Sequence, residues 1–161
     1  MKLTRVETVR IRPRGLLLRL ETDDGLIGGG EPVVEGRAAT TQACIHELEP
    51  YLLGADPRNV EDIWQTIYRG GFYRGGPVLT SALSGIDQAL GDLKGKALGV
   101  PVHELLGGRV REKMEVYSWI DSDTPEICAK SALEKKAQGF RNIKMLGTGR
   151  IGWINDSRAI T

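Results

Sequence analysis

A tyrosine and an arginine in the segment FYRGGP, residues 72–77, are the first groups in this sequence that suggest chemistry. Tyr73 and Arg74 carry hydrogen-bond donors suited to a carboxylate or to hydroxyl groups. The same segment is typical of a turn before a helix, because two glycines allow the turn and Pro77 suits the first helical residue. The residues alone favour the turn and leave anion binding open.

A second set of candidates lies at the ends of two predicted strands. Ser118 and Trp119 close the first strand, and Lys144 closes the second. In α/β barrels the catalytic residues come from the carboxyl ends of the strands and from the loops that follow them. A lysine at a strand end points either into the barrel mouth or outward, so both roles stay open for Lys144.

Motifs of other enzyme classes are missing from the sequence. There is no HExxH, GxSxG or Walker pattern, and the carboxylates show no metal-ligand spacing. The glycines of LIGGGEP follow a strand without opening a helix, so a phosphate site is not expected there. We read His46 and His103 as ordinary structural residues.

Composition excludes further classes of protein. The chain has 161 residues, 22 basic against 21 acidic, and 40% hydrophobic residues. Balanced charge argues against a nucleic-acid partner, and no apolar stretch is long enough for a signal peptide or a membrane span. We expect Cys44 and Cys128 to be buried thiols and the protein to be cytoplasmic, with no membrane partner.

The first two thirds predict an antiparallel sheet followed by helices. Residues 6–11, 16–25 and 26–32 are expected to be strands, with a turn at Asp24-Gly25. Helices are expected over residues 40–54, 56–70 and 78–99, followed by a helical turn in 101–108. We predict Gly54 as a C-cap, a kink at Pro50, Asp56 as an N-cap with Pro57 after it, and close packing at the small residues Ser84, Gly85, Gly91 and Gly95.

The last third changes to an α/β pattern. Residues 113–120 and 140–146 are expected to be strands, with an amphipathic helix over 124–139 capped by Thr124. This spacing predicts a parallel β-α-β unit. A further helix is expected to open at Asn155 or Asp156. Because parallel sheets are normally covered on both faces, we interpret the chain as the N-terminal fragment of a longer α/β protein that is prone to associate or aggregate.

Four segments resemble one family along nearly the whole chain. They are residues 28–37 (GGGEPVVEGR), 62–77 (DIWQTIYRGGFYRGGP), 81–108 (SALSGIDQALGDLKGKALGVPVHELLGG) and 116–119 (VYSW). The sequence resembles the mandelate racemase branch of the enolase superfamily, most closely the galactonate dehydratases, with the mannonate dehydratases as near relatives. The resemblance implies an α+β capping domain over residues 1–110, and the first β-α-β of a truncated (β/α) TIM-type barrel over residues 111–161.

The resemblance also implies a reaction. Members remove the proton α to a sugar-acid carboxylate with Mg²⁺ bound, and the dehydratases then expel the β-hydroxyl to leave a 2-keto-3-deoxy sugar acid. The family's metal ligands lie on the third to fifth barrel strands, and its histidine bases lie beyond the second. We therefore expect this chain alone to bind no Mg²⁺ and to be inactive. Expected partners are a sugar acid, another copy of the chain, or a complementing barrel chain.

Five positions carry over from the family as site residues. The resemblance implies substrate contacts at Glu35, Tyr73, Arg74 and Trp119, and makes Lys144 at most an electrostatic helper. The branch often has Lys-x-Lys on the second strand, whereas this chain has Lys144 followed by Met and Leu. Alternatives are a non-catalytic capping or oligomerisation module, a decayed or split enzyme half, or another reaction of the same branch.

Overall fold

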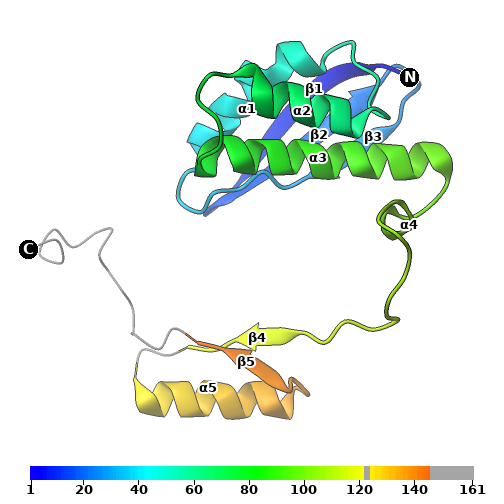
Figure 1. The fold of residues 1–161 in the computed structure, drawn as a ribbon. Coiled ribbons are helices and arrows are strands. Elements are labelled where there is room, and N and C mark those ends of the chain that lie inside the picture. Colours follow the sequence, from blue (N-terminus) through cyan, green and yellow to red (C-terminus); the bar gives the residue numbers. More distant parts are fainter. Residues whose placement is uncertain (122–123, 146–161) are drawn as a thin grey trace, which may run out of the picture. The chain divides into compact units, whose positions relative to one another are not determined.

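A computed structural model describes residues 1–121 and 124–145 (Figure 1). The chain divides into two compact units between Arg109 and Val110, and each unit is described by itself. The first contains a three-stranded sheet and four helices, and the second contains a β-α-β motif. The predicted order of an antiparallel sheet with helices, followed by a parallel β-α-β, is therefore confirmed.

The sheet of the first unit is a simple antiparallel meander. Its strands are β1 (Leu3–Ile11), β2 (Gly15–Thr22) and β3 (Ile27–Gly30), paired in the order β1-β2-β3. The predicted turn joins β2 to β3, where Gly25 has a φ of 83° that favours glycine. Alternate residues of β2 point to opposite faces, and Leu16, Leu18 and Leu20 are buried on one of them.

Three helices cover that buried face: α1 (Ala38–Leu52), α2 (Val60–Gly70) and α3 (Pro77–Leu98) (Figure 1). The predicted apolar stripe of α2 is confirmed, because Ile63 and Ile67 are buried while Val60 and Trp64 pack against the core. The helix α3 contributes most to the core. Its buried residues are Ala82, Leu83, Gly85, Ile86, Ala89, Leu90, Leu93 and Gly95.

Glycines let β3 and α3 meet backbone to backbone. A Cβ added at Gly30 would lie 2.0 Å from the Gly85 carbonyl oxygen, and one at Gly28 would lie 2.2 Å from that of Ala89. No side chain fits in such a space. Close packing is confirmed at Gly85 and Gly95, whereas Gly91 faces open space and Ser84 is exposed. Gly28 and Gly30 of LIGGGEP thus serve packing.

Side chains of α3 also satisfy the free edge of β3. Asp92 accepts a hydrogen bond from the Gly29 amide at 3.0 Å, and Gln88 accepts one from the Glu31 amide at 2.9 Å. The Lys96 ammonium donates to the Ile27 carbonyl oxygen. These contacts occupy backbone groups that an edge strand would otherwise leave open to another chain.

The predicted start of α2 is wrong. The helix begins at Val60 with Asn59 as its N-cap, and Asp56 lies in a preceding turn. The reason is local: the Asp56 carboxylate accepts from the Arg58 amide at 3.0 Å and pairs with its guanidinium at 2.6 Å. These contacts hold the pKa of Asp56 well below its usual value, and they use the oxygens that would have capped the helix.

The other helix ends agree better with expectation. Pro77 is the first residue of α3, and Gly99 ends that helix in the left-handed conformation. The C-cap of α1 is Leu53, one residue before the predicted Gly54, whose amide donates to the Leu3 carbonyl oxygen instead. Pro50 lies inside α1. The predicted turn after α3 is α4 (Val102–Leu105).

The second unit is small and open. The strands β4 (Tyr117–Trp119) and β5 (Asn142–Lys144) pair in parallel, and α5 (Pro125–Ala137) connects them. The Thr124 hydroxyl caps α5 by accepting from the Ile127 amide at 3.3 Å. The helix buries no residue, so the expected amphipathic packing is not seen in the described unit. The helix predicted at Asn155 or Asp156 lies outside the described residues.

Both cysteines are half-buried, so the expectation of two buried thiols is only partly met. Cys44 packs against the core, and burial, with a smaller contribution from Glu47, raises the pKa of its thiol. Cys128 lies on α5, with its sulfur 3.7 Å from the Met145 sulfur.

Candidate functional site

The loop between α2 and α3 presents two aromatic rings to solvent. Phe72 and Tyr73 are 91% and 89% exposed and meet edge to face, with ring centroids 5.2 Å apart. Gly75 and Gly76 have φ values of 78° and 82°, as a turn before a helix requires. The predicted turn is therefore confirmed, and it leaves the Tyr73 and Arg74 side chains free to contact another molecule.

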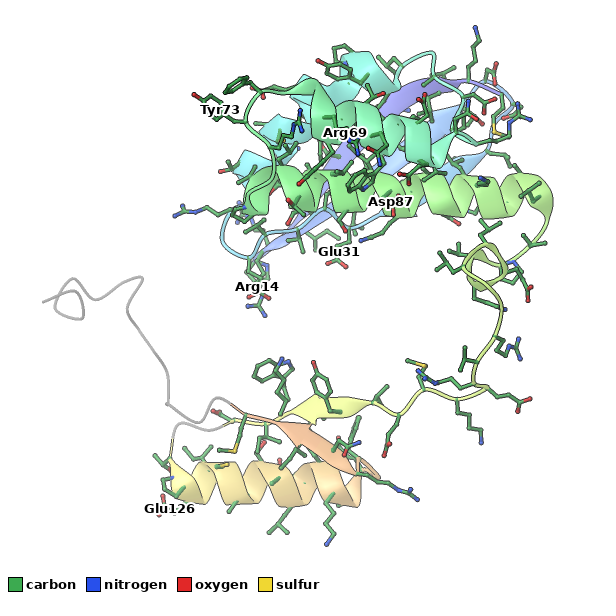
Figure 2. All side chains as sticks on the ribbon, in the orientation of Figure 1. Arg14, Glu31, Arg69, Tyr73, Asp87 and Glu126 are labelled. Atoms are coloured by element: carbon green, nitrogen blue, oxygen red, sulfur yellow. The ribbon has the colours of Figure 1, made fainter. Side chains whose placement is uncertain are left out.

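Glu35 lies in a different loop and is paired. The Arg14 guanidinium, from the turn between β1 and β2, donates to the Glu35 carboxylate at 3.2 Å. Both side chains are more than 60% exposed, so the pair contributes little to stability. It does join the tips of two loops. Figure 2 places Arg14 and Tyr73 toward the same end of the first unit, where α3 begins.

Arginines surround a hollow beside this pair. The hollow, about 560 Å³ in volume, is lined by Arg10, Arg12 and Arg14 together with residues at the start of α1. These arginines were not among the site residues predicted from the sequence. Their signal is the alternation in RIRPR, residues 10–14, at the end of a predicted strand. They give this end of the first unit a positive charge that suits an anionic ligand.

In the second unit, Trp119 and Lys144 are brought together. They are the last residues of the paired strands β4 and β5 and lie directly opposite each other. The Lys144 Nζ lies 4.5 Å from the Trp119 ring centroid and 5.3 Å from that of Tyr117. It also lies 3.5 Å from the Tyr117 hydroxyl oxygen. Cation–π attraction to two rings therefore favours this position of the ammonium, by about 0.5–1 kcal/mol at an exposed site.

These three side chains lie on the face of β4 and β5 that α5 does not cover. Ile143, one residue before Lys144, lines an apolar hollow with Ala132 and Leu133 of α5. Because strand residues alternate between faces, Lys144 and its register partner Trp119 point the other way. The positive charge thus stands at the carboxyl end of a parallel pair, the edge from which α/β enzymes act. Tyr117 was not predicted as a site residue, although its period-two spacing from Trp119 indicates the shared face.

The described residues contain no metal-binding cluster. Within residues 1–121 and 124–145, no group of three or more His, Cys, Asp or Glu side chains could hold a metal ion. His46 serves structure, since it contacts Thr8 at 3.2 Å and pairs with Glu49 on α1. Among the same residues, none of the helices has the length and apolar character needed to cross a bilayer.

The expected site residues thus fall into two groups. Glu35, Tyr73 and Arg74 belong to loops of the first unit, and Trp119 and Lys144 belong to the strand ends of the second. The geometry provides donors for an anion in the first group and a positioned cation in the second. Such groups can bind and orient a carboxylate or a polyol.

Comparison with known proteins shows what this chain is similar to in sequence and fold. Residues 4–107 match the family described as mandelate racemase / muconate lactonizing enzyme, N-terminal domain. The chain is 54% identical over 160 residues to the D-galactonate dehydratase of Ralstonia nicotianae, and 52% identical to that of Pectobacterium atrosepticum. Each alignment covers 99% of this chain and 42% of the relative, so the chain spans about two fifths of their length.

A solved structure extends the likeness to three dimensions. The chain superimposes on an enolase from Pantoea ananatis, solved with bound D-gluconate and Mg, with a TM-score of 0.82 and 38% identity. The match covers 90% of this chain and 36% of that protein. Fold and sequence therefore agree, and the chain belongs to the mandelate racemase / muconate lactonizing enzyme family of the enolase superfamily.

Proposed function

We propose that this chain is the N-terminal part of a Mg²⁺-dependent sugar-acid dehydratase of the galactonate type. The observation that carries the proposal is the 54% identity to a D-galactonate dehydratase over 99% of the chain. In the proposed reaction the α-proton of the sugar acid is removed and the β-hydroxyl leaves, giving a 2-keto-3-deoxy acid. We further propose residues 1–110 as the capping domain and residues 111–161 as the start of the barrel.

The first unit is proposed to supply substrate contacts. The exposed donors of Tyr73 and Arg74 suit the hydroxyls and the carboxylate of a sugar acid. Glu35 would accept from a substrate hydroxyl, and its pair with Arg14 would hold the carboxylate in place until the substrate arrives. These contacts bind and orient the substrate, and they transfer no proton.

The second unit is proposed to supply one positive charge and one flat surface. The Lys144 ammonium, positioned by Trp119 and Tyr117, would offset negative charge as it develops on the substrate. The Trp119 ring would contact the carbon skeleton of the sugar acid. No second lysine follows on the strand, which leaves Lys144 as an electrostatic helper.

Magnesium does not fit the described part of this chain. The residues of 1–121 and 124–145 offer no cluster of ligands, and hard cations such as Mg²⁺ need several oxygen ligands. No step through the metal is therefore assigned to these residues. We propose that the chain by itself does not dehydrate galactonate, and that the metal centre of the active enzyme lies on other barrel strands.

A chimaera tests the proposal directly. Residues 1–145 of this chain replace the equivalent part of the Ralstonia nicotianae D-galactonate dehydratase, which is 54% identical. We expect a folded chimaera that forms the 2-keto-3-deoxy product from D-galactonate when Mg²⁺ is added. A folded chimaera that accepts a different sugar acid would overturn the galactonate assignment, and one that acts on no sugar acid would overturn the proposed function.

Point variants of the chimaera test the roles of single residues. Arg74→Ala removes the guanidinium and its two parallel N–H donors, so it should raise KM about tenfold or more. The KM of Arg74→Lys should lie between those of the wild type and Arg74→Ala, because lysine keeps the charge without the bidentate geometry. For Lys144→Met we expect a fall in kcat of about tenfold or more with little change in KM, as removal of one charge-stabilising group predicts. Unchanged constants in either variant would remove that residue from the site.

The second candidate function is a non-catalytic capping or oligomerisation module, including one half of a split enzyme. The lack of a metal-ligand cluster among the described residues favours it. The chain mixed with the remaining part of the Ralstonia relative, expressed as a separate polypeptide, distinguishes these readings. Restored dehydration would indicate a complementing half, and binding without turnover would indicate a module.

A further inference from the structure

The face of the three-stranded sheet that points away from α1, α2 and α3 has an ordered pattern of its own (Figure 1). We call it the outer face. Strand alternation places every residue between the buried ones on it. Its members that carry a side chain are Arg5, Glu7, Val9 and Ile11 of β1, Leu17, Arg19 and Glu21 of β2, and Ile27 of β3.

One half of the outer face is a closed ring of alternating charges. Arg5 pairs with Glu7 on its own strand at 3.3 Å and with Glu21 on the neighbouring strand at 4.0 Å. Arg19 pairs with Glu7 at 3.5 Å and with Glu21 at 3.2 Å. Each charge thus has an opposite charge on both sides. The ring has no net charge and forms a two-by-two checkerboard.

The other half of the outer face is apolar and exposed. Val9 and Ile11 are each 49% exposed, and Leu17, directly opposite Val9, is 43% exposed. Three branched side chains on adjoining strands form a continuous patch next to the charges. Scattered exposed apolar residues are normal, whereas a contiguous patch bordered by polar residues is typical of an interaction surface.

The cross-strand register makes this face complementary to itself. Arg5 lies opposite Glu21, Glu7 opposite Arg19 and Val9 opposite Leu17. Consider a second copy related to the first by a two-fold axis that runs parallel to the strands, above the outer face and over the midline between β1 and β2. This rotation would stack the two outer faces, with β1 of each copy over β2 of the other. Each residue would then face the second copy's version of its own cross-strand neighbour. Arginine would face glutamate and valine would face leucine, as a two-fold symmetric interface requires.

We propose that the outer face of β1 and β2 is the surface through which two copies of this chain associate. The apolar half supplies the favourable burial, and the charge ring fixes orientation and register, since buried ion pairs add specificity more than affinity. The nine residues of β1 span about 30 Å, and two strands span about 10 Å across. This area is below the roughly 800 Å² per partner of a standard interface, so the dimer should be weak and concentration-dependent.

Sedimentation velocity on the full chain tests the surface. We expect the dimer fraction of the wild type to grow as its concentration rises from roughly 10 µM to 1 mM. Interfaces of this size equilibrate in that concentration range. Leu17→Glu should weaken association about tenfold or more, because a charge enters the apolar half. The matched control is Leu133→Glu, which places the same change on the exposed face of α5 and should leave association unchanged.

The charge pattern allows a second, independent test. The variant Arg5→Glu, Glu7→Arg, Arg19→Glu, Glu21→Arg inverts the ring but keeps every opposite-charge pair within a chain. It should form dimers with itself and fail to pair with the wild type, because like charges would then face each other. Energy transfer between N-terminally labelled chains measures both pairings, and circular dichroism checks that every variant is folded.

Three results would overturn the proposal. The first is a wild-type chain that stays monomeric over the whole concentration range. The second is association that Leu133→Glu abolishes and Leu17→Glu leaves intact, which would place the contact on the second unit. The third is equal energy transfer within and between the wild-type and inverted chains, which would show that the charge ring faces no partner.

Discussion

The two units of this chain use similar residues in opposite ways. In the first unit, apolar side chains from the sheet and from α1, α2 and α3 meet in one continuous buried cluster. In the described part of the second unit only Ile120 is buried, and Tyr117, Trp119, Leu133 and Ile143 are all more than 40% exposed. Burial of apolar area is the main favourable term in folding, so the first unit should contain nearly all of the chain's stability.

The difference has a functional meaning. The first unit holds its proposed contacts, Glu35, Tyr73 and Arg74, on loops at one end of a rigid core, as binding residues often are. The second unit places its lysine by local means, between two aromatic rings. A β-α-β without a core can position one side chain, but it depends on further contacts for its own stability.

Leucine truncations give the largest contrast between the units. Leu90→Ala, in the core of α3, should cost about 2–5 kcal/mol of unfolding free energy because it leaves a cavity. Leu133→Ala, on the exposed face of α5, should change that free energy by less than about 0.5 kcal/mol. Urea unfolding followed by circular dichroism measures both, and similar costs would remove the proposed difference.

The glycine contact between β3 and α3 comes next in size. Gly30→Ala places a methyl group against the Gly85 carbonyl, and we expect a loss of about 3 kcal/mol. Gly29→Ala is the matched control, because a Cβ there meets nothing within 4 Å. Its thermal unfolding should be close to wild type. A Gly30→Ala protein that unfolds at the wild-type temperature would show that the two backbones are farther apart than described.

The aromatic contact of Lys144 should have a smaller effect. Trp119→Leu removes the nearer ring, and we expect a loss of about 0.5–1 kcal/mol in the local stability of the second unit. The ring-current shift of the Lys144 side-chain protons in the NMR spectrum should shrink as well. Tyr117→Phe is the control: it keeps an aromatic ring and should retain most of the shift. Equal shifts in the wild type and in Trp119→Leu would contradict the contact between Lys144 and Trp119.

The smallest predicted effect is on pH dependence, at Asp87 of α3 (Figure 2). The Asp87 side chain is exposed, but partial desolvation of its carboxyl, with a smaller contribution from Glu61, raises the pKa of that group. Because the carboxyl has a higher pKa in the folded state than in the unfolded state, stability is lost as the pH rises from the unfolded-state pKa through the folded-state pKa. Asp87→Asn should therefore stabilise the chain at pH 7 by less than about 0.5 kcal/mol, and should have no such advantage below the unfolded pKa. Thermal unfolding at both pH values measures this difference, and an equal advantage at both would refute it.

Local patterns in the sequence were sufficient to predict most of the elements. The Asp24-Gly25 turn, the start of α3 at Pro77 and the cap of α5 at Thr124 depend on neighbouring residues alone, and each is found where it was expected. The predicted start of α2 was wrong because the Asp56 carboxylate pairs with Arg58 instead of capping the helix. Helix-capping rules do not include this contact.

Contacts between distant segments could not be predicted in this way. Gly28 and Gly30 were expected on a strand, but their close contact with α3 could not be predicted from their own segment. Arg14 meets Glu35 from a different loop, and Tyr117 meets Lys144 from a different strand. Each partner is an ordinary residue in its own segment. What makes these pairs visible is the fold, which brings together residues 21 and 27 positions apart in the chain.

Hydrogen exchange of the native chain tests the central claim, that the first unit alone has a stable core. Amides of β2 and α3 should exchange only through global unfolding, whereas those of α5 should exchange through local opening at rates at least about 100-fold higher. Equal protection of α3 and α5 would contradict the account, because it would show that the two units unfold together as one cooperative structure.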